Sequence, residues 1–206
     1  MITETEIDPL ISVRNPMDLF TVPPIILQIG TVTEKLSRHV TEQIALAHHT
    51  GQPVLPMVIN SRGGDAYAMF AIIDAMLASQ VPIATICTGK GFSSGALIFA
   101  CGAQGMRYMA PNAALMIHEV KHEVGANTTH TANDTITNAG ELKRLNDQAA
   151  ALLAKRTGKP KRTFTKHGDQ DWYLNAHDAV KLGIADHIGI PTLVTRVQVS
   201  MSLERP

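Results

Sequence analysis

A serine that could act as a nucleophile lies in a turn bounded by glycines. Residues 91–95, Gly-Phe-Ser-Ser-Gly, fit the pattern G-x-S-x-G and stand between a predicted strand and a predicted helix. Glycines permit the tight turn that exposes a serine hydroxyl, and the N–H groups at the start of the helix could stabilise a developing oxyanion. A turn rich in glycine and serine can also cap a helix and do nothing else. The pattern alone therefore predicts either a catalytic serine or a helix cap.

A second glycine turn, residues 61–65 (Ser-Arg-Gly-Gly-Asp), also follows a predicted strand and precedes a predicted helix. Two consecutive glycines let the backbone approach a ligand closely and direct amide groups toward it. Alternatively, this is a plain turn in which Asp65 caps the helix. Two such turns at the same end of neighbouring parallel strands predict a site at the carboxyl edge of a sheet.

A zinc-binding pattern competes with the serine. H-E-x-x-H begins at His118 and ends at His122. On a helix the two histidines would share one face and bind zinc, with Glu119 as the base and Glu141 as a further carboxylate ligand. The local residues do not decide whether 113–124 form a helix or a strand. A zinc peptidase therefore remains an alternative.

A catalytic serine needs a base and an orienting acid. Of the nine histidines, only His118 ends an apolar run, residues 113–117, so we expect it to emerge from the core at the end of a strand. Asp169 and Asp171 precede the bulky residues Trp-Tyr-Leu, which could shield a carboxylate. The same residues could instead be a structural histidine and helix-capping aspartates.

Apolar runs alternate with turns along most of the chain and predict the elements that would hold these residues. The predicted strands are 25–29, 54–59, 83–88, 106–109, 114–117 and 184–188, and the predicted helices are 33–49, 66–78, 96–103 and 176–182. This rhythm indicates an α/β fold with parallel strands joined by crossovers. We expect residues 1–24 to form an N-terminal arm and the polar stretch 128–156 to project as a helical arm from the domain 25–206.

Composition limits the classes of function. The chain has 206 residues, and its 18 basic and 18 acidic side chains cancel, so nothing in its net charge favours nucleic acid or an anionic membrane. The first residues lack the basic and apolar regions of a secretory signal, and the sequence has no run of about 18 apolar residues, so we expect neither a signal peptide nor a membrane span. Cys87 and Cys101 stand in apolar surroundings and are expected to be buried thiols. A cytoplasmic single-domain protein is the expectation.

Four segments in the same order resemble the ATP-dependent Clp protease proteolytic subunit (ClpP) family. Residues 58–64 (VINSRGG) resemble the I-N-S-P-G-G turn of that family, and 89–96 (GKGFSSGA) resemble its G-x-A-A-S-M-G-A nucleophile segment. Residues 107–118 (RYMAPNAALMIH) resemble the segment that ends in the catalytic histidine, and 171–186 resemble D-R-F-L-S-A…A-V-x-x-G-L-I-D. The resemblance covers about 25–188, most of the chain.

The resemblance implies a serine endopeptidase with the nucleophile at Ser93, the base at His118 and the acid at Asp171 rather than Asp169. It places the oxyanion hole at the N–H groups of Gly63 and Ser94. It also implies a ClpP/crotonase-like spiral of ββα units and a tetradecamer of two stacked heptameric rings, interlocked by a handle at 128–156. An AAA+ unfoldase such as ClpX or ClpA would deliver unfolded polypeptides. No cofactor or metal is expected.

Several residues depart from the family pattern. Arg62 replaces the usual proline, 90–92 replace mostly small residues, Ser94 replaces a methionine, and Val120 stands where a proline often follows the histidine. Residues 1–24 do not match the axial loops of the family. These departures would suit a divergent or phage-encoded member.

Three further readings remain beside the zinc peptidase. An α/β-hydrolase esterase would use Ser93 with Asp171 followed by His177 or His187, because that fold orders its triad as serine, acid and histidine. A crotonase-type acyl-CoA enzyme would share the spiral but would not need the three triad residues together. An inactive ring subunit would only tune an active partner.

Overall fold

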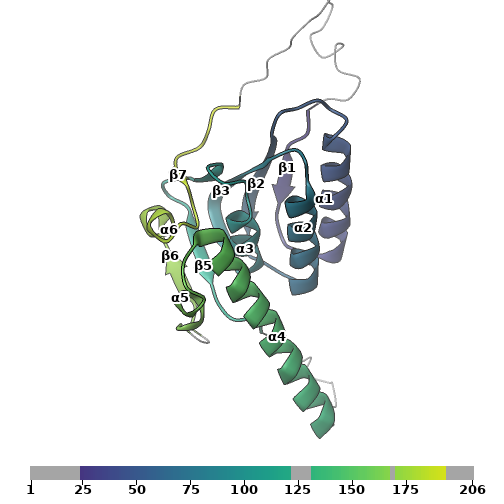
Figure 1. Ribbon diagram of the computed structural model, residues 1–206, viewed down its shortest axis with the longest axis vertical. Coiled ribbons are helices and arrows are strands. Elements are labelled where there is room, and N and C mark those ends of the chain that lie inside the picture. The colour runs from purple at the N-terminus through teal and green to yellow at the C-terminus, as the bar shows by residue number, and fades with distance from the viewer. Residues whose placement is uncertain (1–23, 122–130, 168–169, 194–206) are drawn as a thin grey trace, which may run out of the picture.

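The computed structural model describes residues 24–121, 131–167 and 170–193, which form a mixed α/β fold (Figure 1). The strands are β1 (Leu27–Ile29), β2 (Leu55–Ser61), β3 (Ile83–Phe92), β4 (Arg107–Met109), β5 (Ala114–Ile117), β6 (Trp172–Leu174) and β7 (His187–Ile188). The helices are α1 (Glu34–Ala47), α2 (Ala66–Ala78), α3 (Ser94–Ala100), α4 (Ala132–Thr157), α5 (Arg162–Thr165) and α6 (Ala176–Leu182).

The sheet is mostly parallel, as predicted. Its strand order is β1-β2-β3-β4-β7, and each of these neighbouring pairs is parallel. β5 pairs in parallel with the last three residues of β3, and β6 pairs antiparallel with β5. The α/β class is therefore confirmed, while the antiparallel edge formed by β6 was not predicted.

The strands β1 and β2 bury one face more deeply than the other, as the exposed Gln28 of β1 and Asn60 of β2 show. Along β2, Leu55, Met57 and Ile59 are fully buried, and all seven residues of α3 are buried behind the sheet. α1 is amphipathic: it begins at the cap Thr33 and buries the stripe Val40, Ile44 and Ala47. α2 packs against both α1 and α3.

β3 is longer than the strand predicted at 83–88, because it continues through the first glycine of the serine pattern. Ile59 of β2 pairs with Cys87 of β3, and Ser61 of β2 pairs with Gly91 of β3. Between these two pairs β3 has two more residues than β2. This bulge occurs at Gly89, whose φ is +70°. After the bulge β3 takes β5 as a new partner, which carries the chain toward the candidate site.

The strand that follows α6 is shorter than predicted. A strand was predicted at 184–188, but β7 contains only His187 and Ile188. The N–H groups of Ile184 and Ala185 both donate to the carbonyl of Ala179 and thereby close the C-terminus of α6. These two amides are consequently not free for a sheet. α5 and β6 were not predicted at all, and α3 begins at Ser94 instead of residue 96.

α4 is a helix of 26 residues that begins in a capping box between Thr131 and Asp134 and ends at Gly158 in the left-handed conformation. Its buried residues, Leu145, Ala150 and Leu153, all lie in its C-terminal half. Figure 1 shows the other half extending beyond the neighbouring elements. Of the predicted arm 128–156, residues 128–130 lie outside the described part of the chain, as do residues 1–23 of the predicted N-terminal arm.

Both cysteines are buried free thiols, as predicted. Burial raises the pKa of the Cys87 and Cys101 thiols to about 12 each. Within the described ranges, no helix combines the length and the apolar character needed to cross a membrane.

Candidate active site

Ser93 occupies a strained turn between β3 and α3. Its φ of +53° and ψ of −120° make it the one residue other than glycine with positive φ among those described. Such a conformation costs on the order of 1–3 kcal/mol and persists only where the surroundings impose it. Here the Ser93 N–H donates to the carbonyl of Met116 at 2.7 Å, and its carbonyl accepts from Ala96. Its hydroxyl caps nothing, so the helix-cap alternative does not explain this serine.

The two glycines of the G-x-S-x-G pattern allow neighbouring atoms to pack closely, and neither of them adopts an unusual backbone conformation. Neither Gly91 nor Gly95 has a positive φ. A Cβ at Gly91 would lie 2.8 Å from Cδ2 of Leu115, and one at Gly95 would lie 2.9 Å from Cβ of Ser61. These glycines therefore permit the tight turn through their lack of a side chain, while the positive φ belongs to Ser93 itself.

The second glycine turn lies directly against the serine. A Cβ built on Gly63 would be 2.8 Å from Cβ of Ser93 and 3.2 Å from the backbone nitrogen of Ser94. The Ser94 hydroxyl donates to the carbonyl of Gly64 at 2.9 Å and ties the two turns together. Asp65 caps α2 through a hydrogen bond from Ala68. The predicted meeting of the two turns at one edge of the sheet is thus observed.

The two amides expected in an oxyanion hole differ in their surroundings. Ser94 is the first residue of α3, so its N–H has no acceptor within the helix. The N–H of Gly63 donates to the Ser61 hydroxyl at 3.0 Å in a buried contact. A substrate oxyanion would therefore have to replace the Ser61 oxygen as the acceptor of Gly63.

β5 lies between the segments that carry the serine and the aspartate. On one side it pairs with β3, with Phe92 opposite Met116. On the other side it pairs antiparallel with β6, with Ile117 opposite Trp172. Continuing this register by one residue places His118 opposite Asp171, at the close cross-strand spacing of such pairs. The strand register, not sequence proximity, brings the predicted base and acid together.

His118 and Asp171 face each other without forming a full hydrogen bond. Nδ1 of His118 lies 3.7 Å from Oδ1 of Asp171, beyond hydrogen-bonding distance, and this buried nitrogen has no hydrogen-bond partner. Nζ of Lys121 lies 3.4 Å from the same oxygen. Burial lowers the pKa of His118, as does the charge of Lys121, while the charge of Asp171 partly offsets both. The lowered pKa favours the neutral form of the imidazole, which is the form that a general base requires.

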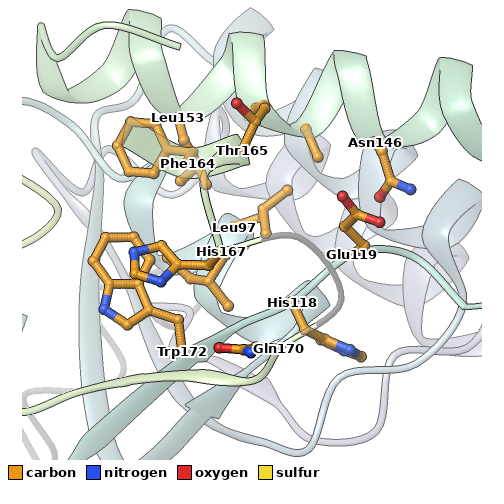
Figure 2. A pocket seen from close by; sticks show the side chains of 13 residues that line it. Leu97, His118, Glu119, Asn146, Leu153, Phe164, Thr165, His167, Gln170 and Trp172 are labelled. Carbon is orange, nitrogen blue, oxygen red and sulfur yellow. The ribbon is translucent and has the colours of Figure 1, made fainter. Parts of the chain in front are cut away.

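A hollow of about 40 Å³ lies beside His118 (Figure 2). Figure 2 shows His167 and Trp172 on one side of it and Glu119 and Asn146 on the other. The rings of His167 and Trp172 stack with their centroids 4.0 Å apart. Its remaining wall is mainly apolar and includes Leu97, Leu153 and Phe164. The base predicted from the sequence therefore borders a small, mainly apolar hollow.

The helix on which the zinc alternative depends is not observed at His118. That alternative required a helix through His118, whereas Ala114–Ile117 is a strand and residues 118–121 are irregular. His122 lies outside the described residues. In the part of the chain that is described, no three His, Cys, Asp or Glu side chains gather in a way that could hold a metal ion.

The α/β-hydrolase alternative also lacks a suitable histidine within the described region. The ring of His187 stacks on Tyr108, and its Nε2 lies 3.0 Å from the carbonyl oxygen of Gly105. His177 is exposed on α6. By contrast, His118 directly follows the strand that receives the Ser93 N–H.

Two residues near the site were missed in the sequence. Ser61 was treated as part of a turn, although a serine two residues before a glycine amide is a common local acceptor. Lys121 is not singled out by any motif, and nothing in the sequence indicates that it reaches Asp171. That contact depends on β6, which was not predicted.

The family model described as Clp protease matches residues 13–191 of the chain. The match covers well over half of the sequence and includes every residue of the site described above. It also agrees with the observed α/β fold and its mostly parallel sheet.

Proposed function

The chain belongs to the Clp protease family and is a serine protease of the ClpP type, and from this premise we propose that it hydrolyses peptide bonds of unfolded proteins through Ser93, His118 and Asp171. The observation that carries the proposal is the placement of β5. This strand contacts Ser93 through the Met116 carbonyl and ends at Ile117, so that the next residue, His118, follows the register that pairs Ile117 with Trp172 and comes opposite Asp171.

The reaction is acyl transfer to serine. His118 accepts the proton of the Ser93 hydroxyl while the oxygen attacks the peptide carbonyl, and the resulting imidazolium then protonates the leaving amine. Asp171 holds the imidazole in the required tautomer and stabilises its charged form. Water then hydrolyses the acyl-enzyme by the same proton transfers in reverse order.

The oxyanion forms beside the two amides of Gly63 and Ser94. The first amide must leave the Ser61 hydroxyl, while the second already stands at the start of α3. Loss of one such donor typically raises the barrier by about 3 kcal/mol. The close approach of the two glycine turns supports this assignment, since a Cβ built on Gly63 would lie 2.8 Å from Cβ of Ser93 and 3.2 Å from the nitrogen of Ser94.

A fluorophosphonate probe followed by peptide mapping tests the proposal. We expect the probe to label Ser93, and Ser93→Ala to abolish both labelling and cleavage of a fluorogenic peptide. Ser79→Ala, at the C-terminal end of α2, is the matched control and should keep both. A chelator that stops cleavage while Ser93→Ala leaves it intact would overturn the serine mechanism in favour of a metallopeptidase.

We also propose that the enzyme works inside a closed assembly of two heptameric rings, fed by an AAA+ unfoldase. The exposed half of α4 supports this, because a helix that leaves its own domain has a side free for a partner subunit. Ile136 is 71% exposed there and is an apolar side chain that a partner subunit would cover. A native mass measurement of the full chain should give a tetradecamer, and a monomeric active peptidase would contradict this part of the proposal.

A further inference from the structure

Asp171 is shared between two cationic or ionisable side chains. Its Oδ1 lies 3.4 Å from Nζ of Lys121 and 3.7 Å from Nδ1 of His118. The lysine is the nearer of the two, and only it lies within hydrogen-bond distance. The imidazole nitrogen is left buried and without an acceptor. Such an orphaned group calls for an explanation, because buried polar atoms are otherwise almost always paired.

A hydrogen bond to α4 anchors the backbone just before Lys121. The N–H of Val120 donates to Oδ1 of Asn146 on α4 at 2.6 Å, which anchors the segment that follows β5. The lysine side chain can therefore extend along the edge of β6 toward Asp171. Both partners are partly open to solvent, with side-chain exposures of 56% for Lys121 and 40% for Asp171. Exposed ion pairs of this kind are weak and exchange readily.

Several charged or titratable side chains lie around His118 in the described part of the chain. Glu119 and Lys121 follow it on the same segment, Asp171 faces it from the start of β6, and His167 lies across the hollow. Of these described groups, Lys121 is the one lysine or arginine that contacts Asp171. Its positive charge also opposes the imidazolium that catalysis must create, in agreement with the lowered pKa of His118.

We propose that Lys121 is a positioning residue that holds Asp171 away from His118 and thereby restrains the triad. The inference rests on the proposed function of Ser93, His118 and Asp171. When Lys121 is neutralised or drawn away, Asp171 accepts the Nδ1–H of His118, which fixes the tautomer and stabilises the imidazolium. Lys121 touches no reacting atom and acts only through its neighbours.

The test compares Lys121→Gln with two controls in the full chain. Lys121→Arg keeps the charge, and Lys181→Gln removes an exposed lysine of α6 that has no contact with Asp171. The first measurement is the pH profile of kcat/KM for a fluorogenic peptide. The second is the NMR titration of His118 in a Ser93→Ala background, which reports its pKa without any need for activity.

We expect Lys121→Gln to raise kcat/KM on the alkaline plateau about two- to fivefold, the effect of removing one exposed charge pair. The same change should raise the pKa of His118 and move the acid limb upward by about half a pH unit. Lys121→Arg and Lys181→Gln should leave the acid limb and the pKa of His118 in place.

An unchanged or lower kcat/KM together with an unmoved pKa, while the fluorophosphonate still labels Ser93, would overturn the inference and leave the proposed function intact. If no variant labels at Ser93, the proposed function fails instead. The NMR titration then still decides whether Lys121 controls His118.

Discussion

Substituting Gly63 with alanine tests how closely the two glycine turns must approach. The new Cβ would lie 2.8 Å from Cβ of Ser93, 2.9 Å from the carbonyl oxygen of Phe92 and 3.2 Å from the nitrogen of Ser94. Carbon atoms in contact normally stand about 3.5–4.0 Å apart, so one of the turns must move by about 0.7 Å or more. The Ser93 hydroxyl would then leave the position from which it reacts.

The expected loss has two parts of different origin. Gly63 has a φ of +95°, and placing a side chain there costs at least about 1–2 kcal/mol of stability. The displacement acts on catalysis, where a shift of about 1 Å costs about 100-fold in rate. We therefore expect Gly63→Ala to react with the fluorophosphonate about 100-fold more slowly while the protein remains folded.

Gly105→Ala separates these two contributions. Gly105 has a φ of +77°, yet a Cβ there would meet nothing within 4 Å. It should lose stability in urea unfolding and keep the labelling rate of the parent protein. If Gly63→Ala lost only as much stability as Gly105→Ala and labelled at the parental rate, the inference that this turn positions Ser93 would be refuted.

Two further predictions concern ionisable side chains whose pKa is shifted. Arg107 is 2% exposed and pairs with Asp186, so Arg107→Met should cost about 3–5 kcal/mol in urea unfolding by leaving a carboxylate unpaired. Burial raises the pKa of Asp186, but the hydrogen bonds and charge of Arg107 outweigh this effect and leave the pKa lowered. The stabilisation by the ion pair should therefore be present above the pKa of the unfolded state and disappear as the pH falls through the pKa of the folded state. An Arg107→Met variant with the parental acid sensitivity would contradict this prediction. The pKa of His118 is lowered from 6.5, mainly by burial, and a general base works only when it is neutral. We therefore expect kcat/KM to rise with pH along an acid limb below 6.5. A limb above that value would show that another group controls the rate.

The sequence predicted the parts of the fold that depend on regular apolar patterns. α2, α6 and β5 have the predicted bounds: α2 and β5 are rich in apolar residues, and the two helices have clear limits at the cap Asp65 and the left-handed Gly183. The pattern failed where tertiary pairing overrode it. β3 continues past the glycines, where Gly91 still pairs with Ser61 of β2 and β5 becomes a second partner.

The contact between acid and base could not be predicted in the same way. β6 has three residues, of which Leu174 alone is buried, so it has no recognisable alternation. Without β6 the antiparallel register is unknown, and with it the pairing of His118 with Asp171. The resemblance to a family pointed to both residues, but it gave no reason for Lys121, whose role depends on the local geometry.

The glycine at position 91 shows how packing, not turn chemistry, determines the site. Leu115 is fully buried, and its Cδ2 occupies the space that a side chain at Gly91 would need. This contact fixes the register of β5 against β3, because successive side chains of a strand point to opposite faces. A slip of one residue would turn Leu115 out of that space and move His118 to the other face of the sheet, away from Asp171. The glycine that precedes the serine therefore contributes to the position of the histidine, although the two are far apart in the sequence.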